Sequence, residues 1–75
     1  MRPERVFGKT FHFASVENAL AFLAFATKVT APYARFVSIT MTGTQVRIDY
    51  LADSIGKEIY EGLDNQLMAY ASTLA

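Results

Sequence analysis

Apolar and polar residues alternate in three stretches of the chain, KTFHFAS, YARFVSITM and TQVRIDYL. Alternation with a period of two is typical of a β-strand with one buried face. The first apolar phase also runs back through Lys9 and Phe7, so we expect that strand to begin or bend near Gly8. Between the second and third stretches, TGT with Gly43 predicts a short hairpin. The apolar phases are Phe11 and Phe13, then Val37, Ile39 and Met41, then Val46, Ile48 and Tyr50.

Two further segments follow helical spacing. The stretch ENALAFLAFATK predicts a helix from about Val16 to about Val29, with Ser15 as N-cap and Glu17 in the first turn. The sequence TAP is expected to end it, because Pro32 disfavours helical geometry at the preceding residue. We expect Asp53 or Ser54 to cap a second helix, whose apolar residues are Ile55, Ile59, Leu63, Leu67, Tyr70 and Leu74.

The element order is therefore β-α-β-β-α, which predicts a single α+β domain over residues 1–75. A right-handed crossover through the first helix leads to a three-stranded antiparallel sheet in the order first, third, second. Both helices are expected to pack on one face, because each strand has only one apolar side. The opposite face would carry Thr10, His12, Ser38, Thr40, Gln45, Arg47 and Asp49.

Composition indicates a small domain that needs support from association. The chain has 75 residues, no cysteine and one histidine, so disulfides and thiolate metal sites are excluded. A net charge of zero argues against autonomous nucleic-acid binding. No apolar run reaches the length of a membrane span, and the N-terminal MRPERVFGK lacks a signal-peptide core, so we expect a cytoplasmic protein with no membrane partner. Arg2, Arg5 and Lys9 form a basic cluster, read either as a solubilising end or as a minor phosphate contact.

Catalytic chemistry has few candidates. His12 has no neighbouring cysteine and no evident carboxylate partner. The acidic residues Glu58, Glu61 and Asp64 are interpreted as a solvated helix face, with Lys57 and Glu61 spaced for an ion pair. We therefore expect neither catalytic residues nor a cofactor or metal.

The first helix is apolar around most of its circumference, and such patches usually mark interaction surfaces. We expect a partner protein to contact its stripe of Phe22, Phe25 and Val29. The second helix contains a helix-weakening Gly62 beside Tyr60, Gln66 and Leu67, which suggests close docking. The candidate partner-binding residues are Phe22, Phe25, Val29, Tyr60, Gly62 and Leu67.

FASVENA, TMTGTQVRIDY and IYEGLDNQL together resemble the small dimerisation subunit of the KEOPS complex, which serves threonylcarbamoyl-adenosine modification of tRNA. The resemblance covers about 60 of the 75 residues. It implies a non-catalytic dimerisation and docking subunit whose helices contact a larger catalytic protein and whose sheet side or edges form a homo- or heterodimer. Such a subunit would reach tRNA only through the complex. Members of that family carry an arginine early in the second helix, where this chain has Tyr60.

A second family, the pterin carbinolamine dehydratases, resembles the chain in the arrangement of helices and sheet. Their chemistry relies on a histidine pair after the first helix, and the matching TKVTAPYARF contains no histidine. This alternative implies a catalytically inactive relative that acts as an assembly factor or dimerising module.

Overall fold

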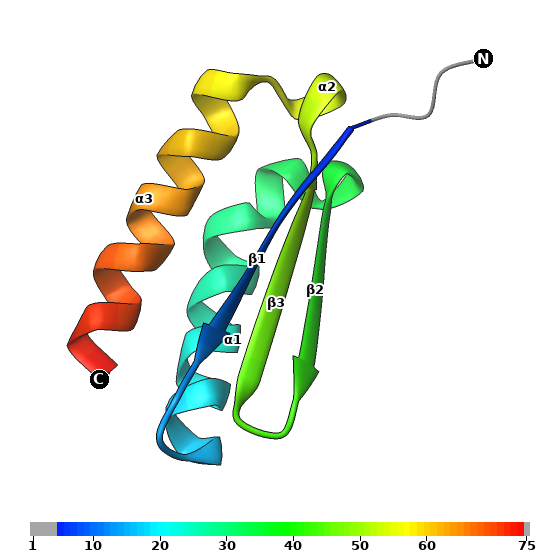
Figure 1. The fold of residues 1–75 in the computed structure, drawn as a ribbon. Coiled ribbons are helices and arrows are strands. Elements are labelled where there is room, and N and C mark those ends of the chain that lie inside the picture. The colour runs from blue at the N-terminus through cyan, green and yellow to red at the C-terminus, as the bar shows by residue number, and fades with distance from the viewer. Residues whose placement is uncertain (1–4, 75) are drawn as a thin grey trace.

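The computed structural model describes residues 5–74 and has the predicted α+β architecture (Figure 1). Helices pack against one face of a single three-stranded sheet. The strands are β1 (Val6–His12), β2 (Val37–Thr42) and β3 (Gln45–Leu51). The helices are α1 (Val16–Thr30), the 3₁₀-helix η1 (Ala31–Phe36), the single turn α2 (Ala52–Ile55) and α3 (Lys57–Leu74).

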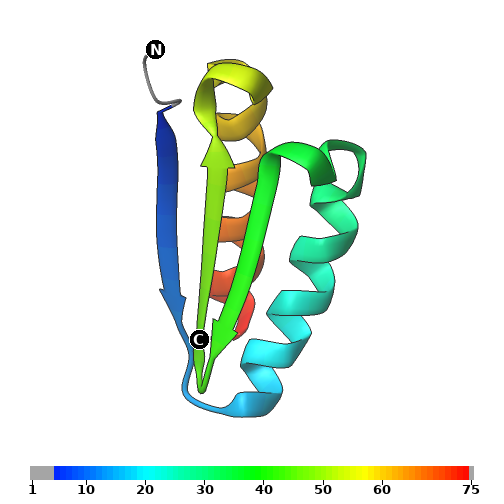
Figure 2. The ribbon, with the colours of Figure 1, turned by 90° about the vertical axis from the view of Figure 1, so that its right-hand side faces the viewer.

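The sheet is antiparallel in the order β1-β3-β2, which confirms the predicted order. Gly43 adopts φ 61° in the two-residue turn between β2 and β3, so glycine is required there. The register places Thr10, Arg47 and Thr40 in one row across the three strands. Figure 2 shows α1 and α3 together on one side of the sheet, which leaves the other side open.

The core lies between this sheet and the two long helices. Phe22 of α1 is fully buried where its ring lies 4.6 Å from that of Phe11 and 4.9 Å from that of Phe13, measured between centroids. Small side chains at Ala19 and Ala26 let α1 approach the strands closely. The buried apolar residues are Phe11, Ala19, Phe22, Ala26, Val46, Ile48, Tyr50, Ile55, Leu63 and Leu67.

Strand β1 begins at Val6 and runs unbroken through Gly8, contrary to the expected start or bend at that glycine. Lys9 shares the inward phase because its ammonium group finds a carboxylate on α3, with Nζ 3.5 Å from Oδ2 of Asp64. Strand alternation places the Lys9 side chain on the helix-covered face of the sheet, and the ion pair with Asp64 balances its charge there. Asp64 therefore belongs to this contact and not to a fully solvated helix face.

The first helix ends within one residue of the predicted position, but the residue after it differs from the expectation. Helix α1 extends to Thr30, whose hydroxyl donates to the carbonyl of Ala26 at 2.7 Å. Ala31 keeps helical angles of φ −52° and ψ −44°, so TAP does not remove it from helical geometry. Pro32 is tolerated because it lies in the first turn of η1, where no amide hydrogen is needed.

The predicted second helix is divided in two at Gly56. This residue adopts φ 90° and ψ 143°, angles that side-chain-bearing residues rarely reach. The break separates α2 from α3, so Asp53 and Ser54 lie within the single turn α2 and not at the start of the long helix. Asp53 instead binds Arg5 at the start of β1, with the guanidinium Nη2 2.7 Å from Oδ1.

Candidate functional site

An apolar groove lies between the end of α1, η1 and the first half of α3. Its volume is about 320 Å³. Helix α1 contributes Val29 and η1 contributes Tyr33, while α3 contributes the opposite wall and the polar ends. The lining residues are Val29, Tyr33, Glu58, Ile59, Gly62, Leu63 and Gln66.

The shape of the groove follows from the residues of α3. Leu63 is buried and forms part of the core, whereas Ile59, one helical turn earlier, is 36 % exposed. An added Cβ at Gly62 would meet no other atom within 4 Å, so this position is open. Glycine thus leaves space for an incoming side chain between Ile59 and Gln66. Glu58 and Gln66 supply polar groups along an otherwise apolar floor, a composition typical of protein-docking surfaces.

Two of the predicted partner-binding residues, Val29 and Gly62, meet in this groove although 32 residues separate them in the chain. Phe25 lies outside it. Its ring stacks on Tyr70 of α3, with centroids 4.1 Å apart and planes inclined by 6°. Phe25 is half-buried and fastens α1 to α3, so most of its surface already has an intramolecular contact.

Phe22 and Leu67 were wrongly placed on a partner surface. Neither side chain has any exposed surface, and both belong to the core. Spacings of three and four residues identify a stripe on a helix, but they do not show which edge of the stripe faces solvent. In α1 the stripe is centred on Phe22, which faces the sheet, and only its Val29 end reaches the groove.

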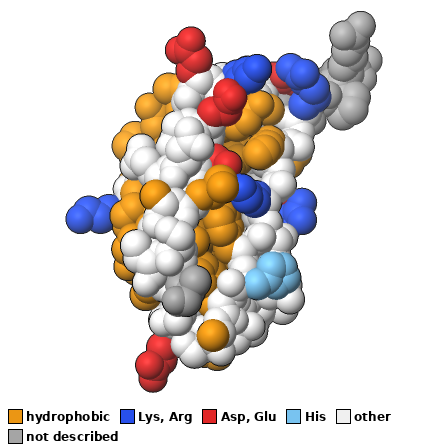
Figure 3. Space-filling view, turned by 60° about the vertical axis from the view of Figure 1, so that its left-hand side comes forward, with side chains coloured by type: hydrophobic (Ala, Val, Ile, Leu, Met, Phe, Trp, Pro, Cys, Tyr) orange, Lys and Arg blue, Asp and Glu red, His pale blue; other side chains and the backbone are white. Residues whose placement is uncertain are grey.

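The remaining exposed surface of α1 is mixed in character, and its exposed residues are Val16, Glu17, Leu20, Ala24, Thr27 and Lys28. Leu20 is half exposed, and Ala24 lies beside it on the solvent side. Figure 3 views another side of the molecule and shows a band of hydrophobic side chains in the middle, with charged groups gathered at its upper end. Exposed apolar surface is therefore spread over several elements.

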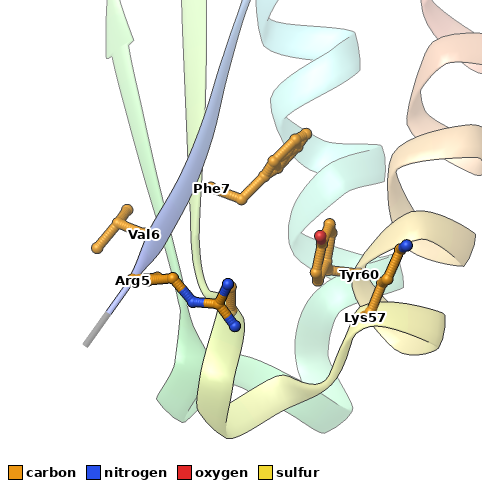
Figure 4. Close-up of a pocket in the computed structure, with 6 residues that line it drawn as sticks. Arg5, Val6, Phe7, Lys57 and Tyr60 are labelled. Atoms are coloured by element: carbon orange, nitrogen blue, oxygen red, sulfur yellow. The ribbon is translucent and has the colours of Figure 1, made fainter.

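Tyr60 lines a different hollow, of about 420 Å³, at the start of α3. Figure 4 shows Phe7 and Tyr60 directed toward one another, with Val6 on the opposite side of β1. Their ring centroids are 4.9 Å apart. The aromatic contact gives a structural reason for tyrosine at position 60.

Arg5 and Lys57 bring positive charge to this hollow. The guanidinium of Arg5 donates to the carboxylate of Asp53 from Nε at 3.0 Å and from Nη2 at 2.7 Å. These hydrogen bonds lower the pKa of Asp53 and raise that of Arg5. The charge of Arg5 is thus paired with that of Asp53, and Lys57 also lines this hollow.

The outer face of the sheet carries the polar residues predicted for it. Arg47 and Asp49 form an ion pair there, with Nε 3.0 Å from Oδ1. His12 is exposed at the end of β1 and pairs in register with Gln45. No ion pair joins Lys57 to Glu61 in the described part of the chain, where the ion pairs are Arg5–Asp53, Lys9–Asp64 and Arg47–Asp49. Arg2 lies outside the described residues.

Sequence reasoning missed Tyr33 and the role of Ile59 in the groove. Tyr33 begins the stretch YARFVSITM, which alternation assigned to a strand, whereas the structure starts β2 only at Val37 and places Tyr33 in η1. Ile59 follows the core spacing of Ile55 and Leu63, but the break at Gly56 rotates α3 relative to α2. The one available signal is the glycine itself, three residues before Ile59.

Within residues 5–74, no group of three His, Cys, Asp or Glu side chains is placed to hold a metal ion. Nor is any described helix long and apolar enough to cross a membrane. Comparison of the chain with protein-family models, curated proteins and solved structures gave no match.

Proposed function

We propose that this protein is a non-catalytic dimerisation and docking subunit of a tRNA-modifying complex of the threonylcarbamoyl-adenosine type. In this proposal its helical layer binds a larger catalytic protein, and tRNA is reached only through that protein. The observation that carries the proposal is the open groove between α1, η1 and α3, lined by Val29, Tyr33, Ile59 and Gly62.

The groove suits an amphipathic helix of the catalytic partner. Its length along α3 covers the turns from Glu58 to Gln66, and the missing side chain at Gly62 permits close approach of a partner backbone or a bulky side chain. Helix-in-groove recognition uses such an apolar channel with polar ends. The resemblance of FASVENA, TMTGTQVRIDY and IYEGLDNQL to the KEOPS small subunit supports the choice of partner.

A binding experiment with two matched variants tests the proposal. The wild-type chain is titrated into the purified catalytic subunit of the threonylcarbamoyl-adenosine complex from the same host. Ile59→Glu places a charge in the groove, and we expect affinity to fall by about tenfold or more because an unpaired charge is buried on binding. Leu20→Glu changes an equally apolar, exposed residue of α1 outside the groove and should leave affinity unchanged.

Circular dichroism of both variants establishes that they fold before affinities are compared. Failure of the wild-type chain to bind the catalytic subunit contradicts the choice of partner. Equal losses for Ile59→Glu and Leu20→Glu contradict the groove. Specific turnover of a pterin carbinolamine contradicts the non-catalytic assignment and favours the dehydratase alternative.

A further inference from the structure

Strand β2 forms one edge of the sheet, and its outer side has no partner in the structure. Figure 1 shows no element beyond it, and in Figure 2, viewed from that side, β2 is uncovered. Among the described residues, no backbone hydrogen bond outside the ladder with β3 involves Val37–Thr42. Unpaired strand edges of this kind act as templates for another strand.

The hairpin fixes which backbone groups of β2 are free. In a hairpin closed by two residues, the flanking pair, here Thr42 and Gln45, is the hydrogen-bonded pair. Alternation along the strand then directs the N–H and C=O groups of Val37, Ile39 and Met41 to the open edge. The side chains of these residues are only half-buried in the single chain, so a further strand would also cover apolar surface.

The two edges of the sheet differ in their protection. Strand β1 carries the inward-facing charge of Lys9, held by Asp64, which is a device that discourages added strands. Strand β2, with the sequence VSITMT, has no charge and no proline, and its one-to-one register with β3 contains no bulge. Of the two edges, β2 is the one open to pairing.

We propose that β2 pairs with β2 of a second copy of this chain, antiparallel and centred on Ile39. Ile39 then faces Ile39 of the second copy, and Val37 faces its Met41 on the helix side of the sheet. On the outer side Ser38 faces Thr40 of the second copy. A two-fold axis perpendicular to the sheet joins both sheets into one and keeps all the long helices on the same face.

The second copy is favoured as occupant because the strand is complementary to itself. In this register each outward N–H and C=O group of Val37, Ile39 and Met41 meets an acceptor or donor of the other copy. Apolar residues oppose apolar ones, hydroxyl residues oppose hydroxyl ones, and no like charges meet. The proposed function also includes a dimer. Pairing through β2 rests on the sheet edge, whereas docking of the catalytic partner rests on the groove, so either proposal can be wrong without the other.

Sedimentation equilibrium at micromolar concentrations tests the proposal with charge variants on the two edges. We expect the wild-type chain to have twice its 8.3 kDa mass. In Ser38→Lys/Thr40→Lys, like charges from the two copies would oppose each other directly, so we expect the dimer to dissociate at least about tenfold more readily. The matched control, Thr10→Lys/His12→Lys, adds lysines to the outer face of β1, where Thr10 faces Arg47 as Thr40 does. It should remain dimeric.

A backbone variant keeps the test decisive if the lysine variant does not fold. Synthesis of the chain with an N-methylated Ile39 amide removes the central outward donor and leaves every side chain unchanged, and we expect it to be monomeric. A monomeric wild-type chain overturns the proposal, as does a dimer that survives both β2 changes. Dissociation by the β1 control also overturns it. Ile59→Glu should leave the dimer intact, which separates this outcome from failure of the groove.

Discussion

Tyr50 carries a hydroxyl group into the core without a hydrogen-bond partner. The side chain has no exposed surface, and Oδ1 of Asp64 is likewise buried and unpartnered. Burial, and secondarily the negative charge of Asp64, raises the pKa of Tyr50 to about 12. A phenol in this position stays protonated to high pH while its hydroxyl remains unsatisfied.

We expect Tyr50→Phe to raise the free energy of unfolding at neutral pH by about 1 kcal/mol, because a buried hydroxyl without a partner is removed. Urea unfolding measures the change, and Tyr33→Phe, at a half-exposed tyrosine in the groove, is the control with little expected effect. A loss of stability in Tyr50→Phe would show instead that the hydroxyl is satisfied, for example through a bound water to Asp64.

Tyr50 also makes the stability of the folded chain depend on pH in the alkaline range. An unfolded tyrosine loses its proton near pH 10, whereas Tyr50 in the folded chain holds it to about 12, so the unfolded state binds fewer protons in between. Stability of the wild-type chain should therefore fall across this window more steeply than that of Tyr50→Phe. Parallel pH profiles for the two chains would contradict the raised pKa.

At the scale of elements, the two glycines of the C-terminal helical region have opposite roles. Gly56 holds positive φ between α2 and α3, whereas Gly62 lies within α3 with open space beside it. We expect Gly62→Ala to stabilise the chain by about 0.5–1 kcal/mol. Gly56→Ala should destabilise it by about 1–3 kcal/mol, because alanine is strained at those angles.

Thermal or urea unfolding of the two variants measures this difference in sign. The binding titration with the catalytic subunit adds a second readout for Gly62→Ala, whose methyl group projects into the groove. Higher stability with weaker binding is the expected combination. Higher stability with unchanged binding would mean that no partner approaches α3 at this position.

Local patterns predicted the elements better than their junctions. Alternation identified three strands, and one apolar face per strand was sufficient to place both helices on one side. The break at Gly56 was missed because Ile55, Ile59 and Leu63 keep an unbroken helical spacing across it. A backbone angle at one residue, not periodicity, divides α2 from α3.

Candidate site residues were harder to predict, because groove and core are defined by contacts between distant segments. Val29 and Gly62 were identified as separate candidates, and only the packing of α1 beside α3 brings them together. Phe22 and Phe25 are both phenylalanines of α1, yet Phe22 faces Phe11 and is buried. Lys9 was recognised as an anomaly in the inward phase, but its partner Asp64 lies 55 residues later in the sequence.

At the scale of the whole molecule, folding removes only a modest share of the chain's surface from water. It exposes 4949 Å². An unfolded chain of 8.3 kDa exposes about 12,000 Å², so folding buries only about 60 % of that surface, as in other marginal small domains. The long helices cover one face of the sheet, while the other face and the β2 edge stay open (Figure 2). Further burial by a second copy would add to stability directly.

We therefore expect the thermal midpoint of the wild-type chain to rise with protein concentration. Association with the folded state stabilises it by mass action, about 2.7 kcal/mol at a concentration of 100 times the dissociation constant. For a domain of this size, each kcal/mol corresponds to roughly 4–8 °C in the midpoint. The β2 variant Ser38→Lys/Thr40→Lys should unfold at a midpoint independent of concentration, whereas the β1 control should follow the wild type. A wild-type midpoint that stays constant from low to high micromolar concentration would show that the monomer is stable without help, and that the open edge of β2 contributes nothing to folding.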